Sequence, residues 1–433
     1  MRSLAKLPAA DYSAGRISTN GRSHGRPAAP AVGANLIHSN LVRAAVAAVA
    51  LSAAPAVPLD QAEAPPPGSP VAAPLAAPVA PEIPVALLVD LSSGQTLFAR
   101  EPNRRFVPAS VTKVMTAYTA FRLIEEGRLS PDAPVVISKE VAELWSGEGS
   151  SMFLEAGDRV TVGQLLLGVT TVSANDGAVA LSLAAVGSQQ TWLDLMNRNA
   201  AELGMHDTHF GTPNGWPDEG RTYTSAHDLA LLAEALTTRY PGLYRRYIGH
   251  RGMRYHEITQ ANHDPVTGIV DGADGIKTGY TRQAGYNFLG SARRGGRRLV
   301  MVIAGAPTPA IRNQTARDLL RWGFEAFESQ RLLPNRAEVG EARVQNGARE
   351  RVPLRTDSDV LASVRPGQIA RAALSVRYRG PIEAPIAEGQ PIAFLRVAVV
   401  GQRPHDVPLV AAAAVPRANP IQRLWHGVVG LLT

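Results

Sequence analysis

The sequence predicts an α/β chain of the α+β kind, in which a mixed sheet-and-helix domain is followed by a small all-β domain. In the first domain, strand-like segments come first, helix-like segments fill the middle, and strand-like segments return. This order favours one layered domain over a repeated strand–helix–strand unit. After Pro334 the helical period is replaced by short alternating segments separated by Gly and Pro. The length of 433 residues also suits two folded units with tails.

The pattern of the N-terminal region predicts a segment for export and not a folded domain. Residues 1–40 are rich in Gly, Arg and Ser without an apolar period, so we expect a disordered leader. Residues 41–64 place a basic residue before a short apolar run and then small residues, which predicts a secretory signal peptide. The alternative, a buried helix, is disfavoured by the prolines that begin at Pro55. Residues 65–82 are predicted to form an extended Ala/Pro-rich linker.

The first domain, residues 83–330, is predicted to open with a β-hairpin. Two short apolar segments, 85–90 and 95–99, flank a turn-like Ser-Ser-Gly. Amphipathic spacing then predicts helices, and two strands return around a second Gly-containing turn. We expect helices at about 111–126, 162–169, 177–186, 190–203, 226–237 and 314–328, and strands at 286–293 and 298–304. This order predicts a single mixed sheet whose edges come from both ends of the domain.

The C-terminal part is predicted to hold a β-domain and a separate helix. Residues 335–412 contain alternating segments, most clearly at 369–378 and 391–400, which predict a small β-domain. Residues 417–433 predict an amphipathic tail helix whose apolar face carries an interfacial Trp425 and suits a membrane surface. Packing of this helix on the β-domain is an equal alternative, because two glycines weaken a free-standing helix.

Composition narrows the possible chemistry. The chain has no cysteine, which excludes disulfides, thiolate nucleophiles and Cys-ligated metals. Its formal net charge of +7 is spread over scattered arginines without an aromatic-interleaved basic stripe, so we expect no nucleic-acid partner. His206 and His209 lack a matched acidic pattern, so we also expect no metal and no cofactor. Only four lysines occur, at positions 6, 113, 139 and 277, and a buried lysine can lose a proton that an arginine keeps.

Two of those lysines stand in short motifs, with a third motif between them. In chain order the motifs are Ser110-Val-Thr-Lys113, Ser173-Ala-Asn175 and Lys277-Thr-Gly279. Each motif is a weak signal alone, and the predicted leader contains decoys of the first two. Their order, their spacing and their positions beside predicted helices and strands together make this set informative.

The first two motifs suit nucleophilic catalysis. Ser110 opens a predicted helix, so Lys113 lies on the same helix face and can take the proton of the serine hydroxyl. Burial and the second cation, Lys277, would lower the pKa of Lys113, and the helix N-terminus offers N–H groups to an oxyanion. Ser173 can relay a proton and Asn175 can hold a substrate carbonyl. The plainer alternatives are a surface serine with a solvated lysine, and helix capping by Ser173 or Asn175.

The third motif suits substrate binding. Lys277 and Thr278 offer a cation and a hydroxyl to a substrate carboxylate. Gly279 allows a ligand or a backbone segment to approach closely. The N–H of Tyr280 can pair with that of Ser110 to form an oxyanion hole. The alternative is an ordinary edge strand with a polar end.

In these motifs and beyond them, the chain resembles the low-molecular-mass penicillin-binding proteins, specifically the secreted serine-type D-Ala-D-Ala carboxypeptidases. Further segments that resemble the family lie at 106–116, 209–215, 274–279, 284–287 and 320–324. The resemblance covers about residues 83–330 and implies a β-lactamase/transpeptidase-like fold for that domain. It also implies that Arg312 binds the terminal carboxylate of the substrate, where a guanidinium suits bidentate recognition.

By this resemblance the chain is expected to hydrolyse the C-terminal D-Ala from peptidoglycan stem pentapeptides through an acyl-enzyme, with β-lactams as inhibitors. The expected catalytic residues are Ser110, Lys113, Ser173 and Asn175, and the expected substrate-binding residues are Lys277, Thr278, Gly279, Tyr280 and Arg312. We expect export to the periplasm, with contact to the outer face of the inner membrane through the tail helix.

Several alternatives stay open at this point. A β-lactamase shares the motifs but needs a placed Glu for deacylation, and no E-x-E-L-N-like segment follows Asn175. Endopeptidase or transpeptidase action fits the same site, and a non-catalytic wall-binding scaffold would depend on the β-domain and the tail. Tyr280 stands where some family members have His, and His263 stands at a family basic position. These two departures leave the substrate preference and the pH optimum open.

Overall fold

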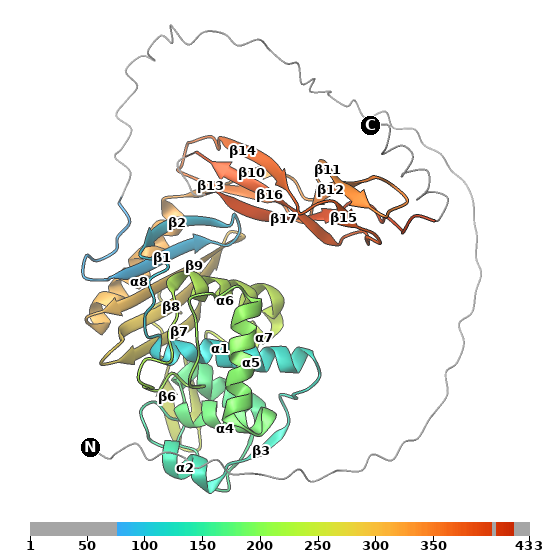
Figure 1. Cartoon of the computed structure of the whole chain (residues 1–433). Coiled ribbons are helices and arrows are strands. Elements are labelled where there is room, and N and C mark those ends of the chain that lie inside the picture. The colour runs from blue at the N-terminus through green and yellow to red at the C-terminus, as the bar shows by residue number, and fades with distance from the viewer. Residues whose placement is uncertain (1–75, 401–403, 420–433) are drawn as a thin grey trace, which may run out of the picture. The chain divides into compact units, whose positions relative to one another are not determined.

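The computed structural model describes residues 76–400 and 404–419 (Figure 1). The predicted leader, the predicted signal peptide and most of the predicted linker lie outside the described residues, as does the predicted tail helix beyond residue 419. The end of the predicted linker is packed, because Val79 is buried in the core of the first domain and Ala77 and Ala80 pack against that core. Within the described residues, no helix is both long enough and apolar enough to cross a bilayer.

A five-stranded sheet forms the centre of the first domain (Figure 1). Its strands, in spatial order, are β2 (Gln95–Arg100), β1 (Val85–Asp90), β9 (Arg297–Ala306), β8 (Gly285–Arg294) and β7 (Ala273–Thr281). The predicted hairpin and the two predicted later strands are confirmed, and the edge strands β2 and β7 come from opposite ends of the domain. The expectation of a mixed sheet is wrong, because each neighbouring pair is antiparallel. Hairpins join β1 to β2 and link β7, β8 and β9, and such connections reverse the strand direction.

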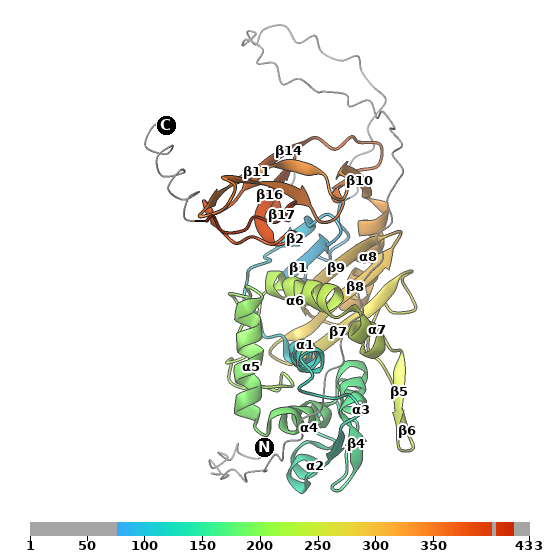
Figure 2. The same ribbon diagram turned by 90° about the vertical axis from the view of Figure 1, so that its right-hand side faces the viewer.

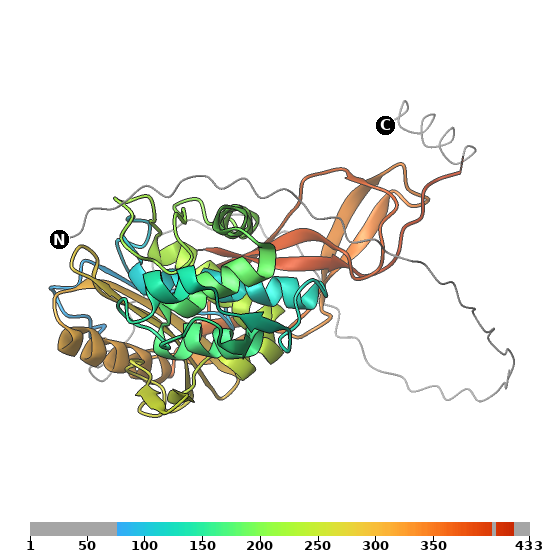
Figure 3. The same ribbon diagram turned by 90° about the horizontal axis from the view of Figure 1, so that it is seen from below.

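Helices cover both faces of this sheet. The helices of the first domain are η1 (Ala109–Thr112), α1 (Lys113–Glu125), α2 (Lys139–Trp145), α3 (Val162–Leu167), η2 (Gly168–Val172), α4 (Asn175–Val186), α5 (Gln189–Glu202), α6 (Ala226–Arg239), α7 (Pro241–Tyr247) and α8 (Pro309–Glu325), and of these η1, α1, α6 and α8 contact the sheet. Side chains alternate along β9: Val300 and Val302 belong to the core shared with α1 and α6, whereas Leu299 and Met301 pack with α8. Figure 2 shows α6 and α8 on opposite sides of the sheet, and Figure 3 shows α8 apart from the green helices from below.

The predicted helices are confirmed, with shifted ends. α8 begins at Pro309, earlier than predicted, because Thr308 caps it by accepting a hydrogen bond from the N–H of Ile311 at 3.2 Å. The sequence pattern does not predict four short pieces, which lack the length to show a hydrophobic period. These pieces are α2, α7, the hairpin of β3 (Pro134–Val136) with β4 (Arg159–Thr161), and the hairpin of β5 (Gly252–Tyr255) with β6 (Ile258–Ala261).

The second domain is all β, as predicted, but it begins directly after α8 instead of at residue 335. β10 (Glu328–Leu333) pairs with β13 (Val360–Val364). The larger sheet has the order β14 (Ala372–Arg377), β16 (Pro391–Val399), β17 (His405–Ala411), β12 (Arg351–Thr356), β11 (Glu338–Gln345) and β15 (Ile382–Glu383). Alternate residues of these strands form a core of Val, Leu, Ile and Ala side chains.

A buried polar cluster connects the β-domain to the central sheet. The Oδ2 atom of Asp90, at the end of β1, pairs with Nη2 of Arg297 at 2.9 Å and accepts a hydrogen bond from Oγ of Ser363 in β13 at 2.8 Å. The Arg297 guanidinium also donates to the backbone carbonyls of Gly323 and Phe327. The cluster therefore ties strand β1, the end of α8 and β13 together.

Candidate active site

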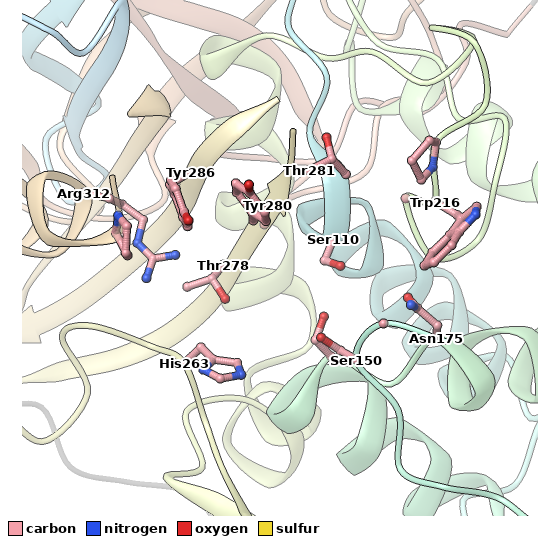
Figure 4. A pocket seen from close by; sticks show the side chains of 16 residues that line it. Ser110, Ser150, Asn175, Trp216, His263, Thr278, Tyr280, Thr281, Tyr286 and Arg312 are labelled. Atoms are coloured by element: carbon pink, nitrogen blue, oxygen red, sulfur yellow. The ribbon is translucent and has the colours of Figure 1, made fainter. Parts of the chain in front are cut away.

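A cavity of about 510 Å³ lies where the edge strand β7 meets η1 and the start of α4 (Figure 4). It is lined by Ser110, Gly149, Ser150, Ser173, Asn175, Gly215, Trp216, Pro217, His263, Thr278, Gly279, Tyr280, Thr281, Tyr286, Pro309 and Arg312. Figure 4 shows Ser110 between Thr278 and Arg312 on one side and Asn175 and Trp216 on the other. The cavity therefore collects residues of all three motifs.

The predicted nucleophile and base are in contact. Ser110 lies in η1, one turn before α1, and Lys113 is the first residue of α1. The Lys113 Nζ atom donates to Oγ of Ser110 at 2.9 Å, to Oδ1 of Asn175 at 2.8 Å and to the backbone carbonyl of Asn214 at 2.7 Å. An ammonium group uses all three hydrogens in this way. In a neutral amine, the lone pair instead faces the serine, whose O–H then donates to nitrogen.

Electrostatics favour the neutral form of that lysine. Lys113 is fully buried, and burial lowers its pKa well below the ordinary lysine value. The positive charge of Lys277 lowers the pKa further, while the negative charge of Asp176 opposes both effects. A neutral Lys113 beside the hydroxyl of Ser110 is a group that can accept the serine proton.

Two glycines let the backbone close around the nucleophile. A Cβ atom at Gly279 of β7 would lie 2.5 Å from the carbonyl oxygen of Pro108, just before η1. A Cβ atom at Gly215 would overlap the carbonyl group of Ala109, and the φ of Gly215 is +74°, a left-handed conformation that glycine adopts without strain. The close approach expected at Gly279 is thus made by the backbone that carries Ser110.

Ser173 and Asn175 reach the cavity from the turn between η2 and α4. The backbone of Ser173 is left-handed, with φ of 65°, and its buried hydroxyl has no hydrogen-bond partner in the described part of the chain. Asn175 donates from Nδ2 to the carbonyl of Glu148 at 2.8 Å, which turns its Oδ1 toward Lys113. Neither side chain caps α4, so the capping alternative is wrong.

The end of the cavity beyond β7 carries buried cations. Lys277 is buried and is not among the residues that line the cavity, and its Nζ atom donates to the backbone carbonyl of Thr278 at 2.9 Å. Burial, with the charge of Arg312 second, lowers the pKa of Lys277 to about 7. Burial likewise lowers the pKa of Arg312 to about 10, and its guanidinium donates to Oδ1 of Asn313. The negative charge of Asp264 opposes the lowering of both pKa values, but no ion pair with Lys277 or Arg312 is found within the described residues, so this end of the cavity suits a substrate anion.

Aromatic side chains flank the opening. The exposed Tyr280 stacks on Tyr286 with ring centroids 4.2 Å apart. On the other side, Trp216 meets Trp145 edge to face at 5.6 Å. Sequence reasoning missed Trp216 and Tyr286 as cavity residues and Asn214 as a partner of Lys113. Only the position of Asn214 inside a family-like segment, residues 209–215, gave a signal for it.

Comparisons with known proteins give one consistent result. Residues 76–308 match the family described as D-alanyl-D-alanine carboxypeptidase, and residues 327–417 match the family described as penicillin-binding protein 5, C-terminal domain. The chain is 34% identical over 348 residues to D-alanyl-D-alanine carboxypeptidase DacD of Salmonella typhimurium, covering 78% of this chain and 87% of the relative.

Solved structures agree with these matches. Penicillin-binding protein 5 from Haemophilus influenzae superposes with a TM-score of 0.65 at 30% identity, covering 78% of this chain and 98% of that one. The ampicillin-bound form of penicillin-binding protein D2 from Listeria monocytogenes superposes with a TM-score of 0.51 at 26% identity, covering 56% of this chain and 98% of that one. The second of these likenesses covers a smaller share of the chain than the first.

Proposed function

Because the chain belongs to the D-alanyl-D-alanine carboxypeptidase family, we propose that its reaction proceeds through an acyl-enzyme on Ser110. The protein is a serine-type carboxypeptidase of the low-molecular-mass penicillin-binding group, and it removes the C-terminal D-Ala of peptidoglycan stem pentapeptides in cell-wall maturation. The contact between Lys113 Nζ and Ser110 Oγ at 2.9 Å, in a buried setting, is the observation that carries the residue assignment.

In the acylation step, Lys113 accepts the hydroxyl proton while Ser110 Oγ attacks the carbonyl carbon of the penultimate D-Ala. The N–H groups of Ser110 and Tyr280 stabilise the negative charge that develops on the carbonyl oxygen. The proton then passes to the nitrogen of the terminal D-Ala as the peptide C–N bond breaks. Ser173 supports this transfer, because its hydroxyl borders the cavity and is committed to no other partner in the described residues. Free D-Ala leaves, and the shortened peptide remains as an ester on Ser110.

Deacylation reverses the roles with water as the nucleophile. Lys113 takes a proton from water, the hydroxide oxygen attacks the ester carbonyl, and the proton returns to Oγ as the ester bond breaks. Asn175 positions the acyl group by holding an amide of the peptide, while its own Oδ1 keeps Lys113 in place. The tetrapeptide product then carries a new C-terminal carboxylate.

The cationic end of the cavity selects the substrate terminus. We assign Lys277, Thr278 and Arg312 to the terminal carboxylate, because a carboxylate accepts hydrogen bonds from two nitrogen donors and a hydroxyl at once. Gly279 contributes through its lack of a side chain, which lets β7 run against η1. An incoming carboxylate also raises the pKa of Lys277 and keeps that lysine charged in the complex.

Export and membrane contact belong to the same proposal. A cell-wall substrate requires the enzyme outside the cytoplasm, and residues 41–64 carry the pattern of a secretory signal peptide. We place the enzyme in the periplasm, with the helix expected at residues 417–433 contacting the outer face of the inner membrane. Fractionation of cells that express the chain with and without residues 420–433 tests both points. Soluble protein in both cases would overturn the membrane assignment.

A penicillin provides the direct test of the nucleophile. β-Lactams acylate the catalytic serine of this family, so benzylpenicillin should leave a penicilloyl adduct on the peptide that contains Ser110 and none on the Ser110→Ala variant, as measured by mass spectrometry. An adduct on another serine would refute the assignment. A long adduct lifetime separates this enzyme from a β-lactamase, which deacylates rapidly.

A further inference from the structure

A buried carboxylate with no role in the proposed reaction lies next to Asn175. Asp176 has no exposed surface. Its Oδ1 accepts from the N–H groups of Gly177 at 2.8 Å and Met152 at 3.1 Å, and its Oδ2 accepts from the N–H of Leu154 at 3.0 Å and Oγ of Ser151 at 2.6 Å. An ionised carboxylate only accepts hydrogen bonds and has about four lone-pair sites, so the four donors match a charged Asp. An Asn at this place would turn an N–H₂ group toward donors.

Three of those donors belong to the segment 148–154, which also forms part of the catalytic cavity. Gly149 and Ser150 line the cavity. The carbonyl of Glu148 accepts from Nδ2 of Asn175 at 2.8 Å, and the carbonyl of Ser150 accepts from the backbone N–H of Asn175 at 2.8 Å. Asp176 therefore fixes the segment whose carbonyls orient the amide that contacts Lys113.

We propose that Asp176 is a positioning residue of the acylation step: it anchors segment 148–154 so that Asn175 holds Lys113 against Ser110, and it places a negative charge near Lys113. The inference rests on the proposed function, because it takes Ser110 and Lys113 as nucleophile and base. Asp176 itself touches neither reacting atoms nor substrate.

The charged groups around the site fix the expected pH effect. Lys113 on α1 is influenced by Lys277 on β7 and by Asp176 on α4. Asp176 also acts on the hydroxyl of Tyr255 in β5, which donates to Asp158. Glu148 is the first residue of the anchored segment, and Glu155 follows its last residue. Because the charge of Asp176 raises the pKa of Lys113, removing it lowers that pKa further. Lys113 is then neutral at lower pH, and the acid limb of the acylation rate moves to lower pH.

Matched variants separate position from charge. Asp176→Asn removes the charge and disturbs the hydrogen bonds, whereas Asp176→Glu keeps the charge and displaces its oxygens. Gln260→Ala is the control, because Gln260 Nε2 donates to the carbonyl of Ser151 at 3.0 Å and so supports the same segment without charge. The acylation rate constant and the affinity for benzylpenicillin are measured for the full chain as functions of pH, with circular dichroism to verify folding.

We expect Asp176→Asn to slow acylation by up to about 100-fold, since small misplacement of a catalytic group has effects of that size, and to shift the acid limb to lower pH. Asp176→Glu should slow acylation because its oxygens are displaced, but the acid limb of the pH profile should not move because the charge is kept. Gln260→Ala should leave the acid limb of the pH profile where it is in the parent. The proposal would be overturned if Asp176→Asn were acylated at the parent rate, or if it were acylated more slowly with the acid limb unmoved, as in Gln260→Ala.

If Asp176→Asn does not fold, a second variant tests the proposal. Ser151→Ala removes one of the four hydrogen bonds without burying a new amide. A slower acylation at unmoved pH dependence supports the anchoring role, and a rate equal to the parent contradicts it. A parent chain that benzylpenicillin does not acylate would contradict the proposed function instead, so the two failures are distinguishable.

Discussion

At the scale of single residues, two buried lysines face opposite demands. In the proposed mechanism, Lys113 must be neutral to accept the proton of Ser110, whereas Lys277 must be charged to attract a carboxylate. Burial pushes both toward the neutral form, and the pKa of Lys277 falls to about 7. In the proposed mechanism, the substrate carboxylate raises the pKa of Lys277 without contacting Lys113 directly. In the absence of that carboxylate, the burial of Lys277 should destabilise the fold.

The burial of Lys277 predicts that Lys277→Met increases the free energy of unfolding by an amount that depends on pH. The pKa of Lys277 is about 7 in the folded protein and near 10.4 in an unfolded chain, so the unfolded state binds more protons between these values. The destabilisation is fully present below pH 7 and fades as the pH rises to the unfolded value. Lys277→Met should therefore be more stable than the parent by at most about 5 kcal/mol below pH 7, and the difference should shrink toward pH 10.

Urea unfolding near pH 6 and near pH 10 measures this difference, at about the two ends of the titration. Lys139→Met serves as the control, because Lys139 is exposed and pairs only with Glu143 at 3.5 Å. An equal gain at both pH values for Lys277→Met would contradict the argument from burial.

Arg312 should control recognition of the substrate terminus. Arg312→Gln removes charge-assisted hydrogen bonds of about 1.5–3 kcal/mol, so kcat/KM on a stem peptide with a free carboxylate should fall about 10- to 100-fold. The loss should appear mainly in KM, because the carboxylate is held equally in the ground state and the transition state. Steady-state kinetics on peptides that end in a carboxylate or an amide provide the measurement.

The control lies on the same helix. Arg321→Gln changes an arginine of α8 that pairs with Asp318 at the surface, so its kinetics should equal those of the parent. If Arg312→Gln still prefers the carboxylate peptide as strongly as the parent does, Arg312 does not bind that carboxylate.

At the scale of elements, the site depends on how closely β7 approaches η1. Gly279 makes this contact possible, because the nearest atom to a Cβ there is the carbonyl oxygen of Pro108 at 2.5 Å. Tyr280 follows Gly279 in β7, and the proposed oxyanion hole pairs its N–H with that of Ser110. The proposed oxyanion hole would therefore depend on a strand and a turn that are far apart in sequence.

Gly279→Ala is predicted to separate these two elements. The added methyl forces β7 or η1 to move, so acylation by benzylpenicillin should slow by about 100-fold, the scale at which one misplaced oxyanion donor acts. Gly242→Ala is the matched control, because a Cβ at Gly242 in α7 meets nothing within 4 Å. Stopped-flow acylation rates of both variants test this, and a fast Gly279→Ala enzyme would show that the contact is not required.

Contacts within one element could be predicted from the residue spacing in the sequence, whereas contacts between distant elements could not. Ser110 and Lys113 were predictable together, because a spacing of three residues places side chains on one helix face. The contact of Lys113 with Asn175, far along the chain, followed only from the order of the family motifs. Lys113 also donates to the backbone carbonyl of Asn214, and a contact to a backbone atom cannot be predicted from the type of residue. Asp176 had the appearance of an ordinary acidic residue in the first turn of a helix, so its anchoring of segment 148–154 required coordinates.

At the scale of the whole molecule, a buried ion pair of the first domain hydrogen-bonds to a serine of the β-domain. The side chains of Arg297 and Asp90 are 10% and 1% exposed, and Ser363 of the β-domain completes the hydrogen bonding of Asp90. The sequence predicted both domains, yet gave no hint of this connection, because its partners come from three separate segments.

Arg297→Met tests the strength of that connection. The variant leaves Asp90 as an uncompensated buried charge, so the free energy of unfolding should fall by about 3–5 kcal/mol. Arg294→Met, in the same hairpin, removes an exposed pair with Asp271 at 4.0 Å and a contact with the Phe324 ring, and it should cost no more than about 1 kcal/mol. Chemical denaturation of both variants gives the comparison, and equal losses would contradict the special role of the buried pair.

The most direct test of the account is the release of free D-alanine from a stem pentapeptide that ends in D-Ala-D-Ala, with the parent chain and its Ser110→Ala variant side by side. The proposed mechanism predicts that the parent releases free D-alanine and that the Ser110→Ala variant releases none above background, while both proteins remain folded. Release by Ser110→Ala at the parent rate would contradict the assignment of the nucleophile, and with it the catalytic role given to Lys113.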